Sequence, residues 1–174
     1  TPTTPGMATE LAVRSYGIPD EWPEAALAEA EALPKRVTPA AKRGRTDLRE
    51  LAFVTIDGAD ARDFDDAVYV ERRRGGWVLW VAIADVSHYV RPDSPLDEEA
   101  VVRGTSVYFP NRVIPMLPEA LSNGLCSLNP KVDRLAMVAE IKLGPRGAYK
   151  SATFYPAVIR SHARLTYDQV QAYI

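Results

Sequence analysis

Five carboxylates lie within ten residues of this 174-residue chain, and their type and spacing could do chemistry. They are Asp57, Asp60, Asp63, Asp65 and Asp66. The flanking residues 51–56 and 67–70 are apolar and typical of core strands. Holding so many like charges between core segments costs free energy unless a cation neutralises them. Hard cations such as Mg²⁺ bind carboxylates together with substrate phosphates, so the cluster predicts a metal site for phosphate chemistry.

Two other interpretations of the acidic segment can be compared with a metal site. Acidic runs are often solvated loops, but surface loops rarely carry this density between segments rich in Val, Ile, Phe and Tyr. A calcium helix–loop–helix site beginning at Asp63 would need an acid and then Gly where the chain has Ala67 and Val68. On an extended strand Asp63 and Asp65 would share one face and Asp66 the other. All three carboxylates can meet one metal ion only if the segment loops or kinks. We therefore expect irregular backbone between two strands.

The composition excludes several classes of protein. With 21 basic and 23 acidic residues the net charge is −2, so the chain lacks the overall basic character of many nucleic-acid binders. A single cysteine, Cys126, excludes an internal disulfide and fits a reducing cytosol, so we expect a cytoplasmic protein. No apolar run approaches the ~18 residues of a membrane span. Residues 1–6 lack the charged start and apolar stretch of a signal peptide.

Two helices and a basic segment are predicted before the acidic cluster. Residues 7–15 are compatible with a helix that Gly17 stops, and residues 24–33 with a second helix that begins after Pro23. Residues 35–49 contain six Lys and Arg side chains and are interpreted as a connecting segment. It could be a solvated linker or could touch an RNA backbone.

The sequence from residue 51 alternates between strand and helix patterns. Strands are expected at 67–72 and 77–84 around an Arg-Arg-Gly-Gly turn, at 107–109, and at 135–143 and 148–159. Helices are expected after the Ser94 cap, at 118–123 closed by Gly124, and after Thr166, which has capping-box spacing. This mixture predicts an α+β fold: a mixed, largely antiparallel sheet with flanking helices.

The acidic motif resembles the signature of the ribonuclease II/ribonuclease R exoribonucleases, in their RNB catalytic domain. Asp57-Gly58 and Asp60-Ala-Arg-Asp-Phe-Asp-Asp-Ala67 carry the resemblance, which continues through residues 80–87, 103–110, 114–118 and 121–128. The Asp-Gly and Gly-Thr-Ser-Val-Tyr-Phe-Pro motifs are closer to those of ribonuclease R than to those of ribonuclease II. The resemblance runs from about Pro19 onward. It implies that residues 51–174 are the N-terminal portion of an RNB catalytic domain and that residues 1–50 are a helical and linker segment leading into it.

The resemblance implies a chemistry and a role for each site residue. The parent protein would hydrolyse single-stranded RNA processively from its 3′ end, with Mg²⁺, and release nucleoside 5′-monophosphates. Asp57, Asp63 and Asp66 would bind the metal, and Asp65 would hold the substrate end and support the chemistry. Asp60 would shape the loop. The residues expected to contact RNA are Tyr108, Tyr167, Arg103 and His162.

The resemblance also indicates that the chain is a piece of a longer protein. Neither the arginine-bearing motif of the later catalytic domain nor the flanking RNA-binding barrels are found in these residues. We expect both to be partners of this piece and the piece alone to have little activity. Two other functions stay open: a catalytically inactive RNA-binding or interaction module, and a metal-dependent phosphodiesterase acting on another nucleic acid.

Overall fold

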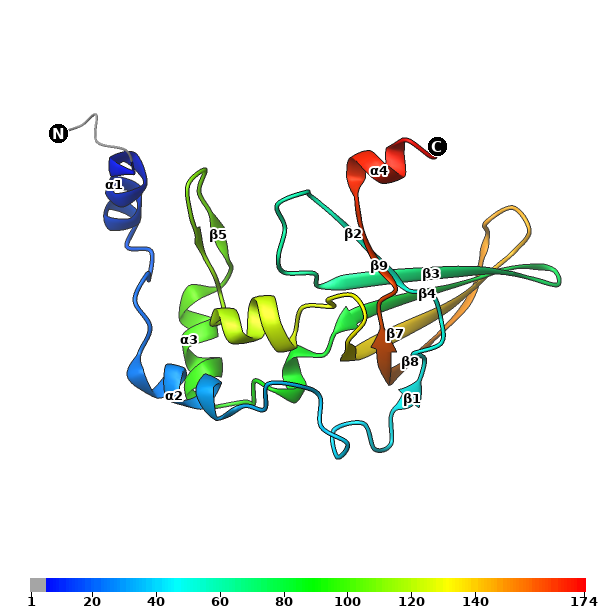
Figure 1. Ribbon diagram of the computed structural model, residues 1–174, viewed down its shortest axis with the longest axis horizontal. Coiled ribbons are helices and arrows are strands. Elements are labelled where there is room, and N and C mark those ends of the chain that lie inside the picture. Colours follow the sequence, from blue (N-terminus) through cyan, green and yellow to red (C-terminus); the bar gives the residue numbers. More distant parts are fainter. Residues whose placement is uncertain (1–5) are drawn as a thin grey trace.

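A seven-stranded mixed sheet dominates the fold of the computed structural model, which describes residues 6–174 (Figure 1). The strand order is β1-β8-β7-β4-β3-β2-β9, with β1/β8 and β2/β9 parallel and every other pair antiparallel. The strands are β1 Thr46–Asp47, β2 Val54–Asp57, β3 Asp66–Arg73, β4 Gly76–Ala84, β7 Asp133–Leu143, β8 Tyr149–Arg160 and β9 Ala163–Thr166. The predicted α+β fold with a largely antiparallel sheet is confirmed. Residues 1–5, which bear on the expected absence of a signal peptide, lie outside the described residues.

Helices α2, α3 and η2 gather at one end of the sheet, and α1 lies beyond them (Figure 1). The helices are α1 Met7–Tyr16, α2 Glu24–Ala32, the 3₁₀ turn η1 Val86–His88, α3 Pro95–Arg103, the π-helix η2 Ala120–Leu125 and α4 Tyr167–Gln171. A separate two-stranded hairpin, β5 Val107–Tyr108 and β6 Val113–Ile114, follows α3. Among residues 6–174, no helix combines the length and the apolar character needed to cross a membrane.

Local sequence signals account for several element boundaries. Gly17 ends α1 in a left-handed conformation (φ 60°), which glycine adopts without a Cβ penalty. The Ser94 side chain accepts a hydrogen bond from the Asp97 N–H at the start of α3, and Thr166 and Gln169 form the expected capping box of α4. Helices α1, α3 and α4 therefore begin or end where the sequence predicts.

The core lies between one face of the sheet and the helices. Trp80 of β4 and Val138 of β7 are buried there, together with Leu96 of α3 and Leu121 of η2. Burial of each such aliphatic side chain contributes ~1.5–3 kcal/mol. Glu29 of α2 accepts a hydrogen bond from the Leu96 N–H at 2.9 Å, which places a carboxylate at the positive end of the α3 dipole. The core thus fixes the position of α3.

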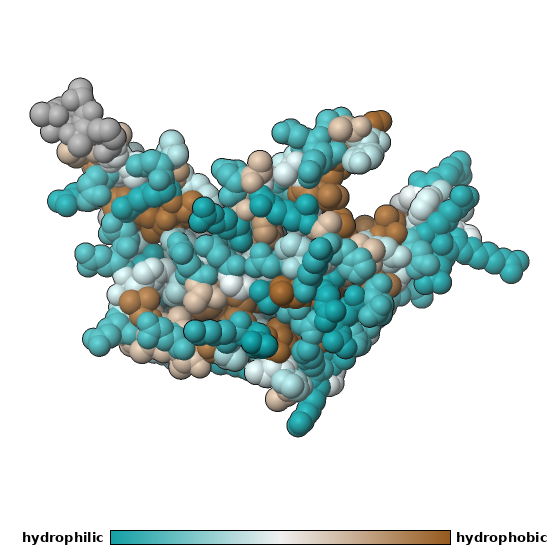
Figure 2. Space-filling model, in the orientation of Figure 1, coloured by the Kyte–Doolittle hydropathy of each residue, from teal (hydrophilic) through white to brown (hydrophobic). Residues whose placement is uncertain are grey.

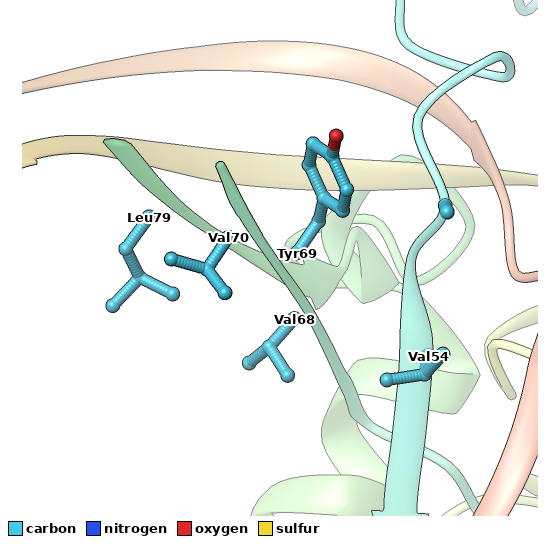
Figure 3. Close-up of a pocket in the computed structure, with 6 residues that line it drawn as sticks. Val54, Val68, Tyr69, Val70 and Leu79 are labelled. Carbon is cyan, nitrogen blue, oxygen red and sulfur yellow. The ribbon is translucent and has the colours of Figure 1, made fainter. Parts of the chain in front are cut away.

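The opposite face of the sheet is apolar and partly open to solvent. Val70, Ile83 and Phe154 are exposed on β3, β4 and β8. A shallow pocket of about 230 Å³ lies on this face, lined by Ala52, Val54, Val68, Tyr69, Val70 and Leu79 (Figure 3). Its lining holds no carboxylate, so it is separate from the acidic cluster. Apolar residues also reach the surface near α1 and α4 (Figure 2).

The basic segment 35–49 is bound to the sheet rather than being a free linker. Asp133 of β7 accepts hydrogen bonds from Lys42, from Arg49 at 3.4 Å and from Arg160 at 2.7 Å. Arg45 pairs with Asp85 at 2.5 Å. Lys42, Arg45 and Arg49 thus have protein partners, whereas Lys35, Arg36 and Arg43 are exposed to solvent.

Several features of the fold differ from the sequence-based expectation. Strands β1 and β9 were not predicted, because each is short and pairs in parallel with a strand distant in sequence. Gly124 does not close a helix: it lies inside η2, where the Cys126 N–H donates to the Leu121 carbonyl at 2.9 Å. A hydrogen bond between residues five positions apart is the π-helical pattern, and no local sequence signal predicts it here.

Candidate metal and RNA site

The acidic loop joins the end of β2 to the start of β3. Asp57 is the last residue of β2 and Asp66 the first of β3, and the eight residues between them have irregular backbone, as predicted. Phe64 anchors the loop: its side chain is buried, its N–H donates to Ser127 Oγ at 3.0 Å and its carbonyl accepts from the Leu128 N–H at 2.8 Å. A buried Phe64 leaves its neighbours Asp63 and Asp65 on the solvent side of the loop.

The pKa shifts in the loop show which carboxylates act on one another. Partial burial raises the pKa of Asp57, and the charges of Asp66 and Asp63 raise it further. Partial burial also raises the pKa of Asp65, and Asp63, Asp66 and Asp57 add to that rise. The structure thus brings these four side chains within electrostatic reach of one another. Asp60 is exposed, and its charge is not among the causes that raise the pKa of Asp57 and Asp65.

The chemistry of this donor set fits a hard divalent cation. Asp57 Oδ2 is buried and has no hydrogen-bond partner, so a cation bound there would satisfy an oxygen that the protein leaves unpaired. It would also relieve the repulsion among the four carboxylates. Within residues 6–174, no three His, Cys, Asp or Glu side chains are arranged closely enough to hold an ion as they stand. The roles of Asp57, Asp63 and Asp66 as metal ligands therefore stay predictions.

Arg164 of β9 contacts the acidic loop, although the sequence analysis did not single it out. Its Nη2 donates to the carbonyls of Gly58, at 3.2 Å, and Ala59. Its guanidinium lies 5.0 Å from the centre of the Phe64 ring, and its charge opposes the rise in the pKa of Asp57. Arg164 reaches the loop because β9 pairs in parallel with β2. Only that long-range pairing, which no local pattern reveals, could have identified it.

Two of the expected RNA-contacting residues flank the acidic loop. Tyr108 of β5 donates its hydroxyl to Asp63 Oδ2 at 2.5 Å, and this bond, with partial burial, raises the pKa of Tyr108 to about 12. Tyr167 begins α4 directly after Thr166, which pairs with Asp57. Both tyrosines are 62% exposed, so their ring faces are open to solvent. The loop accordingly rises between the hairpin and α4 in Figure 1.

His162 lies away from the acidic loop. It is exposed and precedes β9, and its N–H donates to the Phe53 carbonyl at 2.7 Å, just before β2 begins. Since β2 and β9 run parallel, His162 is at the opposite end of β2 from Asp57. The structure therefore does not bring His162 together with the carboxylates, and a contact with RNA there stays a prediction.

Arg103 does not fit the expected RNA contact. Its side chain is only 2% exposed, and its guanidinium lies 3.5 Å from the centre of the Trp22 ring. Its Nε donates to Glu99 at 2.7 Å, its Nη1 to the Pro115 carbonyl at 3.1 Å and its Nη2 to the Glu21 carbonyl at 2.7 Å. A guanidinium this buried and this well paired is a packing group. All four of these partners lie outside residues 103–110, the motif that suggested RNA binding, and a contact of Arg103 with RNA stays a prediction.

Comparison with known proteins gives consistent matches. Residues 45–174 match the RNB domain. The chain is 62% identical to "Ribonuclease R" of Vibrio parahaemolyticus over 169 residues, which make up 97% of this chain and 20% of that protein. It is also 62% identical to "Ribonuclease R" of Escherichia coli over 166 residues, 95% of this chain and 20% of that protein. The chain thus spans about a fifth of the length of these relatives.

Solved structures extend the comparison to the fold. "Mycoplasma genitalium RNase R in complex with double-stranded RNA" superposes with a TM-score of 0.93 at 40% identity, covering 98% of this chain and 30% of that one. The structure titled "Structure of yeast Ssd1, a pseudonuclease" has a TM-score of 0.72 at 19% identity and covers 80% of this chain and 18% of that one. At that identity the second match shows a shared fold alone.

Proposed function

Because this chain belongs to the RNB domain family, we propose that it is part of the catalytic domain of a Mg²⁺-dependent exoribonuclease. The enzyme degrades single-stranded RNA processively from the 3′ end and releases nucleoside 5′-monophosphates in the cytoplasm. The remainder of the catalytic domain and the flanking RNA-binding barrels are its partners within the protein. One observation carries the proposal most strongly: four carboxylates share one loop, where Asp57 keeps a buried oxygen unpaired and an exposed tyrosine contacts Asp63.

The residues of the loop have distinct roles in this proposal. Asp57, Asp63 and Asp66 hold Mg²⁺, which supplies phosphoryl polarisation and a more acidic bound water when present. Asp65 holds the 3′ end of the substrate and organises charge around the scissile phosphate. Arg164 fixes the backbone of Gly58 and Ala59, which keeps Asp57 and the following loop in one arrangement.

The two exposed tyrosines bind the substrate. Bases of a single strand stack on aromatic faces with little sequence preference, at ~1–3 kcal/mol per base. Tyr108 and Tyr167 lie on either side of the loop, so a strand stacked on them would place its end near the carboxylates. This arrangement favours a single strand, because the bases of a duplex are not free to stack on side chains.

The alternative function is a binding one: the chain could belong to a catalytically inactive RNA-binding module. The fold shared with the yeast protein titled a pseudonuclease means that the fold alone does not decide activity. The carboxylates favour an enzyme. Such a cluster is costly to keep in a protein without a cation, and Asp57 keeps a buried oxygen unpaired.

The proposal is tested by digesting 5′-labelled and 3′-labelled single-stranded RNA with the natural protein that carries this chain, in Mg²⁺ or in EDTA. We expect 3′-labelled RNA to release labelled mononucleotide at once and 5′-labelled RNA to shorten without early intermediates, both only with Mg²⁺. Binding without cleavage would support the inactive module. Equal cleavage of a DNA strand of the same sequence would indicate the broader phosphodiesterase.

A further inference from the structure

The hairpin that carries Tyr108 is too small to hold its own position. Strands β5 and β6 pair through two residues each, closed by a hydrogen bond from the Phe109 N–H to the Arg112 carbonyl at 2.9 Å. An isolated two-stranded hairpin is at best marginally stable in water. The position of Tyr108 therefore depends on contacts made to the hairpin from outside.

Residues 6–22, here called the N-terminal strap, supply contacts at the tip of the hairpin. Thr9 donates its hydroxyl to Asn111 Oδ1 at 2.7 Å, and Asp20 pairs with Arg112 at 2.9 Å. Asn111 and Arg112 lie in the turn between β5 and β6. The strap thus touches the hairpin tip from both α1 and the segment that follows α1.

Arg103 joins the base of the hairpin to the same strap. It stacks on Trp22 and donates to the carbonyls of Glu21 and Pro115, so one buried guanidinium links the end of the strap to the end of the hairpin. Glu99, one turn earlier on α3, balances its charge at 2.7 Å. These hydrogen bonds have a charged donor, and such bonds are stronger than those between neutral groups.

The hairpin therefore lies between two supports. Tyr108 reaches Asp63 on one side, and the strap holds the tip and the base on the other. The strap precedes residues 45–174, the part that matches the RNB domain. We propose that the N-terminal strap is a positioning element of the RNA site, which acts through Arg103 to hold Tyr108 beside the acidic loop.

A double-mutant cycle on RNA affinity tests this inference, which rests on the proposed contact between Tyr108 and RNA. Trp22→Ala removes the stacking face of Arg103, and Trp22→Phe keeps an aromatic face. Tyr16→Ala is the matched control, since Tyr16 is an aromatic residue of the same strap that is 83% exposed. Binding of a single-stranded oligonucleotide in EDTA is measured for each variant, alone and with Tyr108→Ala.

We expect Trp22→Ala to weaken binding about tenfold, within the range of one lost stacking contact. Trp22→Phe and Tyr16→Ala should stay within about threefold of the parent. With Tyr108→Ala present, Trp22→Ala should add nothing, because sites that act through one contact are not additive. Full additivity of the two changes, or the loss of binding in Tyr16→Ala, would overturn the role of the strap.

Amide hydrogen exchange separates this inference from the proposed function. The Phe109 N–H should exchange faster in Trp22→Ala and Arg103→Met, and at the parent rate in Tyr16→Ala, whether or not RNA binds. If Tyr108→Ala leaves RNA affinity unchanged while this pattern holds, the Tyr108–RNA contact fails and the strap stands. Unchanged exchange in both Trp22→Ala and Arg103→Met would remove the strap.

Where Trp22→Ala does not fold, the Asp20–Arg112 pair provides a second test. Asp20→Arg and Arg112→Asp should each speed hydrogen exchange of the hairpin amides. The double variant, in which the two charges are swapped, should return the exchange rates to those of the unmutated protein. The absence of rescue would contradict the inference.

Discussion

Asp65 and Asp60 belong to one loop but differ in their surroundings, which makes them a matched pair of variants. The charges of three other carboxylates act on Asp65, whereas Asp60 lies outside that group. We expect Asp65→Asn to lower kcat at least ~10²-fold, as for loss of a charge-organising group, and Asp60→Asn to change it less than about threefold. RNA affinity should largely survive both changes, because phosphate and stacking contacts elsewhere dominate it. Steady-state turnover and fluorescence anisotropy measure the two effects. Near-normal turnover of Asp65→Asn would remove it from the catalytic residues.

A substitution of Asp57 tests whether this residue binds the cation. Its buried, unpaired oxygen and its repulsion by Asp63 and Asp66 destabilise the chain without metal. We expect Mg²⁺ to raise the melting temperature of the unmutated chain and EDTA to reverse the rise. Asp57→Asn should melt higher than the parent in EDTA and respond less to Mg²⁺. Circular dichroism melts measure this, and an undiminished Mg²⁺ response of Asp57→Asn would exclude it as a ligand.

Single residues also show where sequence reasoning stops. The acidic loop could be predicted because five carboxylates lie within ten residues of the sequence. Arg164 could not, because its contact with Ala59 spans 105 residues and depends on the β2–β9 pairing. The burial of Arg103 could not be predicted for the same reason: its motif is local, but Trp22, which covers it, lies 81 positions earlier in the sequence.

At the scale of elements, Asp133 joins the basic segment to β7 and β8. Burial alone would raise the pKa of Asp133, but hydrogen bonds from Lys42 and Arg160 outweigh burial and lower it. A lowered pKa means that its stabilisation is present above the ordinary value of 3.8 and is lost as the pH falls through the folded-state pKa. We expect Asp133→Asn to lower the free energy of unfolding by roughly 1.5–3 kcal/mol at neutral pH.

The pH dependence distinguishes this charge effect from a packing defect. The difference between Asp133→Asn and the parent should shrink as the pH falls below 3.8, measured by urea unfolding at several pH values. Glu10→Gln is the control, because its pair with Arg14 is exposed and should contribute less than about 1 kcal/mol. A difference that stays constant with pH would mean that Asp133 acts by packing alone.

Elements with a local signal could be predicted, and those without one could not. The β3–β4 hairpin, the Ser94 cap and the Thr166 capping box are each specified by neighbouring residues, and the structure contains all three. Strands β1 and β9 have two and four residues and gain their hydrogen bonds from distant partners. The π-helix η2 arises from packing under the sheet, where Leu121 and Leu125 are buried, and overrides the helix stop expected at Gly124.

At the scale of the whole molecule, the charge distribution predicts how metal and RNA affect each other. The net charge is −2 and four carboxylates share one loop, so RNA phosphates approaching that loop meet repulsion unless a cation is bound. The Asp65→Asn variant, whose cleavage is slow, allows binding to be measured in both conditions. We expect it to bind a single-stranded oligonucleotide more tightly in Mg²⁺ than in EDTA at matched ionic strength. Fluorescence anisotropy measures the difference, and a second substitution, Asp57→Asn, should reduce it. Equal affinity in Mg²⁺ and EDTA would show that the cation does not mediate the approach of RNA to this loop.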